Sequence, residues 1–71
     1  MEVKDIKISL KACRANANME QKVWAEKVGV SFNTISNWEN GKGEPSLSQL
    51  RIISELSKIP IDCIVMSTDS I

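Results

Sequence analysis

The chain has 71 residues, 42% of them hydrophobic and 25% charged, which is typical of one small globular domain over residues 1–71 and argues against a disordered tail. It contains no histidine and its nine acidic residues form no paired pattern, so we expect no catalytic residue, no metal site and no cofactor. The formal net charge is zero and the pI is about 6.2, which argues against a protein that holds nucleic acid by charge alone, although residues 1–30 carry six Lys and Arg against four Asp and Glu.

Helical periodicity runs through the chain, and no stretch alternates apolar and polar residues as a half-buried strand would, so the sequence predicts an all-α fold. Asp5 is a suitable N-cap for a first helix over residues 5–16. Its inner face repeats at helical spacing through Ile6, Leu10, Cys13 and Ala17. A second helix is predicted over residues 20–28, with Gly29 as its left-handed stop and a stripe of Met19, Val23 or Trp24, and Val28.

Ser31 is placed to cap a third helix that carries Ile35 and Trp38 inward. Its other faces hold Phe32, Asn33, Ser36 and Asn37. Two glycines and a proline predict a loop over residues 40–45. The S-x-x-Q capping box at residues 46–49 opens a fourth helix that ends near Lys58, with an apolar stripe of Leu47, Leu50, Ile53 and Leu56. A short fifth helix is predicted over residues 61–66.

The two cysteines, Cys13 and Cys63, form no C-x-x-C pair, so a metal or redox motif lacks its usual spacing. A disulfide between them is one alternative, and two buried thiols in a reduced, cytoplasmic protein is the simpler one. The sequence shows neither a charged leader followed by an apolar segment nor an apolar run of about 18 residues. We therefore expect a cytoplasmic location and no membrane partner.

Two short helices joined by a glycine-containing turn are typical of a helix-turn-helix, here over about residues 20–39, but this pattern alone is weak. The stretch MEQKVWAEKVGVSFNTISNWENGKGEPSLSQL, residues 19–50, closely resembles the Cro and phage-repressor family, also called the xenobiotic-response-element type. The likeness extends over residues 6–65 and includes Gln21, Ala25, the turn at 28–30, TIS-x-WENGK at 34–42 and PSL at 45–47. It implies a compact five-helix bundle of the lambda-repressor-like DNA-binding type, with the third helix in the major groove.

The resemblance implies that Phe32, Asn33 and Asn37 contact bases, and that Ser31 and Thr34 approach the groove beside them. An asparagine amide can pair with both N6 and N7 of adenine, and Phe32 can pack on a thymine methyl group. The alternatives are a merely solvated face for the two asparagines and a protein interface for Phe32.

Positions flanking the third helix resemble family positions that contact phosphates: Gln21, Asn40 and Lys42. The N–H groups at a helix N-terminus beside Gln21 suit an anion, and the glycines Gly41 and Gly43 allow backbone N–H groups to approach the phosphate chain. In the family, an arginine matching Arg14 pairs with a glutamate matching Glu39, so we expect this structural ion pair, with a phosphate clamp at Arg14 as the alternative. We expect Trp38 to lie in the core.

Four residues depart from the family pattern. Glu20 replaces the usual small N-cap residue and would be repelled by a nearby phosphate, and Glu44 adds an acid to a loop that is often basic. Both suggest weak affinity per monomer. Lys58 stands where a helix-ending glycine is common, and Pro60 replaces a capping hydroxyl. These two departures affect only the position of the fifth helix.

The sequence therefore predicts a sequence-specific regulator of transcription, a repressor, that binds double-stranded DNA. Because the chain carries few positive charges, we expect a homodimer, at least on DNA, with two recognition helices in successive major grooves. Its candidate interface is the apolar set Ile61, Ile64, Val65 and Met66, which can alternatively close the core. The rival prediction is a protein-interaction module, an antitoxin-like or antirepressor partner, which uses the same bundle and is favoured by the neutral charge and Glu20.

Overall fold

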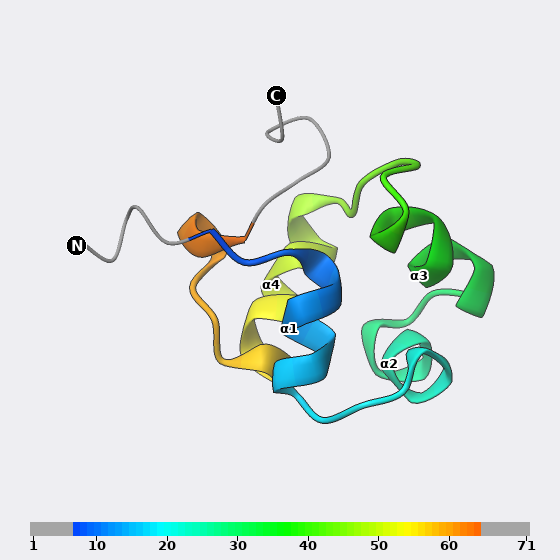
Figure 1. Ribbon diagram of the computed structural model, residues 1–71, viewed down its shortest axis with the longest axis horizontal. Coiled ribbons are helices and arrows are strands. Elements are labelled where there is room, and N and C mark those ends of the chain that lie inside the picture. Colours follow the sequence, from blue (N-terminus) through cyan, green and yellow to red (C-terminus); the bar gives the residue numbers. More distant parts are fainter. Residues whose placement is uncertain (1–6, 65–71) are drawn as a thin grey trace.

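Four short α-helices surround a shared apolar core. The computed structural model describes residues 7–64, and there it contains α1 (Leu10–Asn16), α2 (Gln21–Val28), α3 (Phe32–Glu39), α4 (Leu47–Ser57) and the 3-10 helix η2 (Ile61–Cys63) (Figure 1). Helix α1 packs mainly against α4, and α2 packs mainly against α3. The all-α prediction is confirmed. The predicted count of five helices is not supported among residues 7–64, because the start of the predicted fifth helix is the single 3-10 turn η2 and Ile64 after it is extended.

The first helix begins later than its periodicity predicts. Ser9 is the N-cap of α1, and its hydroxyl accepts a hydrogen bond from the backbone N–H of Ala12 at 3.0 Å. Ile8 is extended: it forms an isolated parallel bridge with Ile64, and its N–H donates to the carbonyl of Cys63 at 2.7 Å. A backbone pairing with a distant segment therefore outweighs the local helical pattern at residues 7–9. The predicted cap Asp5 and the predicted core residue Ile6 lie outside the described residues.

The predicted ends of the next three helices are confirmed. Gly29 ends α2 in the left-handed region with φ 89°, a conformation that suits a residue without a Cβ. Ser31 caps α3 by accepting from the N–H of Thr34, and Ser46 caps α4 in a capping box with Gln49. Helix α4 ends at Lys58, which adopts φ 61°. That conformation is rare for a residue with a long side chain.

The segment after α4 closes the core instead of forming a fifth helix. After Pro60 the chain makes one 3-10 turn, and Ile64 returns to extended backbone beside Ile8. Ile64 is only 4% exposed and Ile61 is half-buried, so Ile64 belongs to the core and not to an open dimer interface. Val65 and Met66, the other members of the predicted interface, lie outside the described residues.

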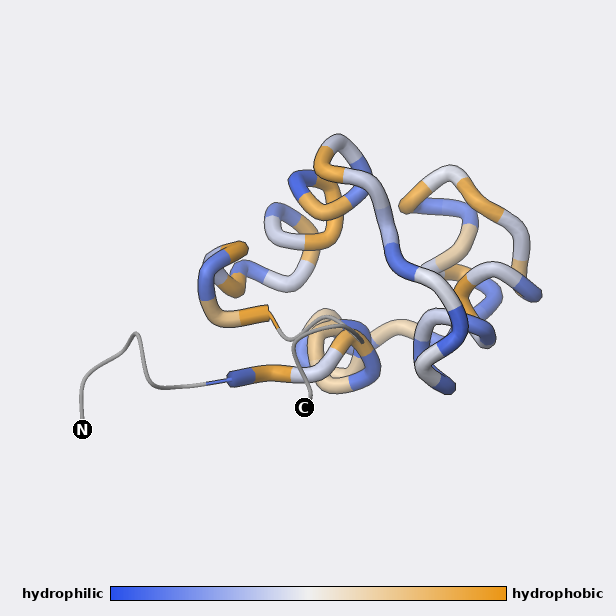
Figure 2. Tube along the Cα trace, turned by 90° about the horizontal axis from the view of Figure 1, so that it is seen from above, coloured by the Kyte–Doolittle hydropathy of each residue, from blue (hydrophilic) through white to orange (hydrophobic). Residues whose placement is uncertain are grey.

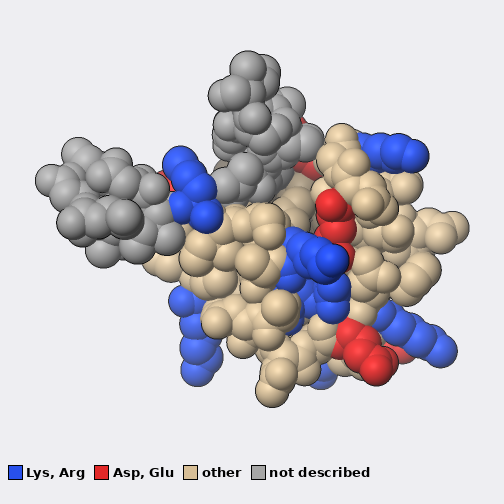
Figure 3. Space-filling view, viewed as in Figure 1, with Lys and Arg blue, Asp and Glu red and all other residues tan. Residues whose placement is uncertain are grey.

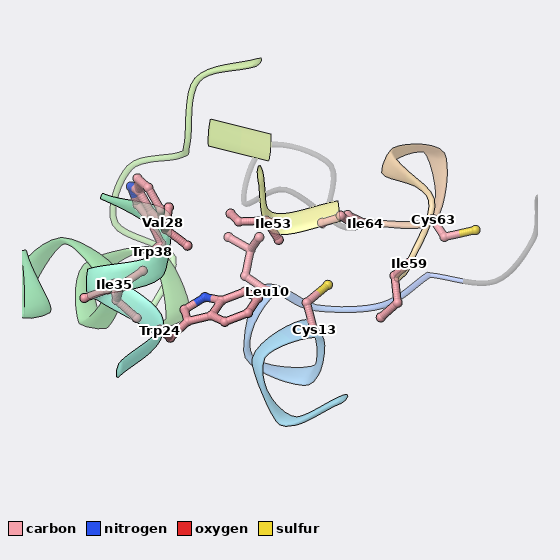
Figure 4. Close-up of a cluster of buried hydrophobic side chains, with 11 residues drawn as sticks. Leu10, Cys13, Trp24, Val28, Ile35, Trp38, Ile53, Ile59, Cys63 and Ile64 are labelled. Carbon is pink, nitrogen blue, oxygen red and sulfur yellow. The ribbon is translucent and has the colours of Figure 1, made fainter. Parts of the chain in front are cut away.

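The core draws residues from every helix and from the segment after α4. Trp24, Ile35 and Ile53 are almost completely buried, and Leu10 points in toward them from α1 (Figure 4). Fully burying an apolar side chain of this kind stabilises the fold by about 1.5–3 kcal/mol. Figure 2 shows apolar and polar residues interspersed along the helices, as amphipathic helices packed around a core require. The structure confirms that Trp38 lies in the core, at 9% exposed.

One predicted core residue is on the surface. Leu47 is 59% exposed because it is the first residue of α4, directly after its cap. The rest of the predicted stripe holds: Ile53 is buried, and Leu50 and Leu56 are half-buried against the core. For the inner stripe of α2 the sequence left Val23 and Trp24 as alternatives. Trp24 is the core residue, because it is buried whereas Val23 is 40% exposed.

A polar contact joins the ends of α1 and α4 beside this core. The side-chain amide of Asn16 donates to the carbonyl of Ser57 at 2.7 Å, and the buried Ser57 hydroxyl donates to the carbonyl of Ile53 at 2.7 Å. Cys13 and Cys63 are buried thiols with no disulfide between them. Burial raises the pKa of the Cys13 thiol, and a hydrogen bond with Ser57 lowers this pKa in part. Cys13 is therefore a neutral, inert thiol at pH 7.

Candidate nucleic-acid interface

The predicted recognition helix has one buried side and one exposed side. Ile35 and Trp38 are fixed in the core, whereas Phe32, Asn33 and Asn37 are exposed. Asn33 and Asn37 are four residues apart, so their side chains lie one above the other on the same face of α3. Phe32, the first residue of α3, is 50% exposed and lies beside them. The structure thus leaves two amides and one aromatic ring accessible together.

The amides of Asn33 and Asn37 differ from most amides in the chain because they have no intramolecular hydrogen bond among residues 7–64. Four of the other five side-chain amides are bonded within the fold, and Asn18 is the exception. The bonded pairs are Asn16 with Ser57, Gln21 with Glu39, Asn40 with Ser36, and Gln49 with Ser46. An amide that satisfies neither its donor nor its acceptor within the fold can offer both to an external partner.

Ser31 and Thr34 are committed to the start of α3. The Ser31 hydroxyl accepts from the Thr34 backbone N–H at 3.1 Å, and the two side-chain hydroxyls lie 2.9 Å apart. Each hydroxyl retains further hydrogen-bonding capacity, but its position is fixed by the cap. These two residues therefore hold the exposed N-terminus of α3 in shape.

A charged network ties α3 to the helices behind it. Arg14 on α1 donates through Nε to Glu39 Oε2 at 2.8 Å and through Nη2 to Glu39 Oε1 at 3.2 Å. Its Nη1 donates to the carbonyl of Met19 at 2.9 Å. The hydrogen bond to Glu39 raises the pKa of Arg14. The ion pair that the family resemblance implies is present, and Arg14 is not available as a phosphate clamp.

Gln21 joins the same network, a contact that the sequence did not predict. Its Nε2 donates to Glu39 Oε1 at 2.9 Å, across 18 positions of the chain. No local pattern encodes a contact of this range, so only the tertiary arrangement reveals it. The side-chain amide has two N–H donors, and one remains for an external acceptor. Glu20, the N-cap before it, makes no side-chain cap hydrogen bond.

The loop after α3 folds back onto the C-terminus of this helix. The Asn40 side chain donates to the Ser36 carbonyl at 2.9 Å, and the Lys42 backbone N–H donates to the Asn37 carbonyl at 2.7 Å. The Gly41 N–H donates to the Trp38 carbonyl at 3.1 Å, so it is not free to approach a phosphate as the sequence predicted. Gly41 instead supplies a positive φ of 79°. The Lys42 side chain remains exposed.

Positive and negative side chains share the face of the molecule drawn in Figure 3. On that face, Lys and Arg side chains lie over several elements, with acidic groups among them. Glu20 and Glu44 are both exposed near the two ends of the candidate interface. Among residues 7–64 there is no cluster of His, Cys, Asp and Glu able to hold a metal ion, and no helix long and apolar enough to cross a membrane.

This arrangement of α2, a tight turn and α3 is a helix-turn-helix, and comparison with protein families agrees. A family model described as helix-turn-helix matches residues 10–62, more than half of the chain. The chain therefore belongs to the helix-turn-helix family of the Cro/C1 type.

One relative is the HTH-type transcriptional activator BcrR of Enterococcus faecalis, which is 40% identical over 53 residues. The match covers 75% of this chain but only 26% of the relative. The likeness therefore concerns about a quarter of that relative's length. No solved structure matches the chain significantly.

Proposed function

We propose that the chain is a sequence-specific DNA-binding regulator of transcription that places α3 in the major groove. The observation that carries the proposal is the two-sided character of α3 in a helix-turn-helix chain. Ile35 and Trp38 anchor one side, and the unpartnered amides of Asn33 and Asn37 stand exposed on the other. A helix of this kind fits the major groove, where amides read base edges. The function involves no catalytic step and no cofactor.

Within this proposal the exposed residues divide into two roles. Asn33 and Asn37 contact bases, Phe32 packs on a thymine methyl group, and Ser31 and Thr34 line the groove beside them. Phosphate contacts, which fix position without reading sequence, come from Gln21, Asn40 and Lys42. The spare N–H of Gln21 and the exposed ammonium of Lys42 support these assignments.

We further propose that the chain acts as a homodimer on DNA. A net charge of zero gives a single copy little electrostatic hold on the duplex, and a second copy doubles the contacts. Two copies would place their α3 helices in successive major grooves, about 34–36 Å apart. Sedimentation of the chain with and without a two-site duplex tests this: a complex with one copy per duplex at saturation would contradict it.

We propose repression as the regulatory outcome. A domain bound over a promoter blocks polymerase by occupancy alone, which requires nothing beyond DNA binding. The relative is named an activator, but the matched region is 26% of its length. In vitro transcription with the binding site placed over or upstream of a promoter separates the two outcomes, since repression by occupancy depends on overlap.

A second candidate function is supported by the neutral charge and by the half-exposed Phe32. In this alternative the same bundle binds a protein partner, in the manner of an antitoxin or an antirepressor. The candidates differ in their response to salt, because DNA binding releases condensed counterions and protein binding through an aromatic residue does not.

Fluorescence anisotropy with mixed-sequence duplex DNA, measured across a salt series, tests the proposed function. We expect log affinity to fall linearly with log salt, with a slope of about −0.9 for each phosphate contacted. Lys42→Ala should weaken binding to all sequences equally and reduce the slope by about 1. Lys58→Ala, which removes an exposed lysine at the far end of α4, is the matched control and should leave the slope unchanged. No binding at low salt would favour the protein-interaction alternative.

A further inference from the structure

Helix α3 carries the sequence FNTISNWE, which contains no arginine and no lysine. From this we infer that the base pairs read by α3 are A·T pairs, with adenines opposite Asn33 and Asn37 and a thymine methyl group against Phe32. The inference rests on the proposed function and adds the class of DNA sequence that the site accepts.

The side chains on α3 lack the charged groups that pair best with guanine and cytosine, so its amides and hydroxyls can give these bases only single hydrogen bonds, whereas an amide gives adenine two. Guanine is read by donors to O6 and N7, which arginine and lysine supply, and cytosine is read by a carboxylate that accepts from N4. The one carboxylate of α3 is Glu39, and it is 5% exposed and paired with Arg14. It cannot reach a base without breaking that pair. The groups that remain are amides, hydroxyls and one aromatic ring.

The two amides are free to form the adenine contact. An amide side chain pairs with adenine by accepting from N6 and donating to N7, so it needs both functions unoccupied. The side chains of Asn33 and Asn37 are exposed, and their amide groups make no hydrogen bond within residues 7–64. The hydroxyls of Ser31 and Thr34 lie 2.9 Å apart and are held in the cap of α3, whereas both functions of each amide are unoccupied, so the amides are the main readers.

The spacing of the amides sets the spacing of the bases. Four residues along a helix span about 6 Å, and stacked bases are about 3.4 Å apart along one strand. With the axis of α3 along the groove, the two adenines would therefore lie about two base pairs apart. Phe32 comes directly before Asn33, so its thymine would lie at the edge of this short A·T segment.

The nearest cation to α3 along the chain on its C-terminal side is Lys42, and it lies at the wrong end to change this preference. Its backbone N–H is bonded to the Asn37 carbonyl, which holds the loop at the C-terminus of α3. Base contacts in helix-turn-helix proteins come from the recognition helix itself, and residues of the flanking loops meet the DNA backbone. Lys42 therefore serves a phosphate and not a guanine.

The test begins with selection of binding sites from a random duplex library by the whole chain, followed by chemical changes to single bases. The expected site has A·T pairs at the positions contacted by α3. Replacing the read adenine by 7-deazaadenine, which lacks the N7 acceptor, should weaken binding about 5- to 100-fold. If Asn33 reads the replaced adenine, the replacement should not further weaken the binding of Asn33→Ala. If Asn37 reads it, the replacement should not further weaken the binding of Asn37→Ala. Uracil in place of thymine should weaken wild type but not Phe32→Ala.

The outcomes separate the inference from the function on which it depends. Salt-dependent binding with G·C pairs selected at the α3 positions, or with no base preference, would overturn the inference and leave DNA binding intact. Absence of duplex binding would overturn the proposed function and the inference with it. Asn33→Arg provides a gain-of-function arm, since an arginine there should shift the preference at its position to guanine. An unchanged preference in this variant would also contradict the inference.

Discussion

Arg14 on α1 and Glu39 on α3 are joined by two hydrogen bonds, at 2.8 and 3.2 Å, across 25 positions of the chain. The Glu39 side chain is 5% exposed and that of Arg14 is 16% exposed. The pair fixes the C-terminal end of α3 against the body of the molecule. It therefore controls the orientation of the exposed helix face through a contact that is not part of that face.

Removing Arg14 should destabilise the fold strongly. Arg14→Met leaves the nearly buried Glu39 carboxylate with only the Gln21 amide, which should lower the free energy of unfolding by about 3 kcal/mol. Because a domain of this size has little stability to lose, the double variant Arg14→Met/Glu39→Leu is also needed, and it should recover most of the loss. Urea unfolding of both variants measures this. Equal losses in the single and double variants would show that the charge of Glu39 is not the cause.

Replacing Lys58 by glycine should stabilise the protein. The φ of 61° at this helix end costs a residue with a Cβ about 1–2 kcal/mol, whereas glycine adds about 0.4–1 kcal/mol of unfolded-state entropy. The strain is the larger effect, so Lys58→Gly should gain about 0.5–1 kcal/mol and raise Tm by about 4 °C. Lys58→Ala keeps the Cβ and should stay within about 0.5 kcal/mol of wild type. A loss of stability in the glycine variant would contradict the backbone argument.

Changing Glu20 should separate helix capping from DNA repulsion. Glu20 is the N-cap of α2 but makes no side-chain cap hydrogen bond. Glu20→Thr should stabilise the fold by about 0.5–1 kcal/mol through a new cap and should raise DNA affinity roughly fivefold at low salt by removing a negative charge. Glu20→Gln removes the charge without a good cap, so it should raise affinity alone. Calorimetry and anisotropy on both variants give the two readouts, and unchanged affinity in both would remove Glu20 from the interface.

The raised pKa of Cys13 predicts a loss of stability in alkali. Above the ordinary thiol pKa the unfolded chain releases this proton while the folded chain keeps it, so the free energy of unfolding falls as pH rises, by at most about 1.4 kcal/mol per pH unit. The contribution is complete at neutral pH. Urea unfolding between pH 7.5 and 10 should show a shallower decline in Cys13→Ala than in wild type. Parallel curves for the two proteins would contradict this effect.

Sequence reasoning succeeded where a local pattern determines the structure. Gly29, Ser31 and the capping box at Ser46 place the ends of α2, α3 and α4 through interactions that span only a few residues. The division of α3 into a buried side with Trp38 and an exposed side with Asn33 follows from helical periodicity in the same way. The sequence left a disulfide between the cysteines open and favoured two buried thiols as the simpler state, and the structure shows two buried thiols.

It failed where distant segments meet. Because Ile8 pairs with Ile64, α1 begins at Leu10 and not near residue 5 as predicted. No sequence feature near residue 8 predicts a partner so far along the chain. The Asn16 contact to Ser57 and the Gln21 contact to Glu39 were missed for the same reason. The pair of Arg14 and Glu39 was expected from family resemblance and not from spacing. Predicting a long-range polar contact requires knowing how the helices pack, and hydrophobic periodicity does not give that packing.

The most direct test of the central claim is a nitrogen–proton NMR titration of the labelled chain with a duplex obtained by selection. The side-chain amide signals of Asn33 and Asn37 should shift strongly, whereas those of Asn16 and Gln49, which are bonded within the fold, should stay in place. Unchanged Asn33 and Asn37 signals at saturating duplex, with the shifts confined to α1 and α4, would contradict the placement of α3 in the major groove.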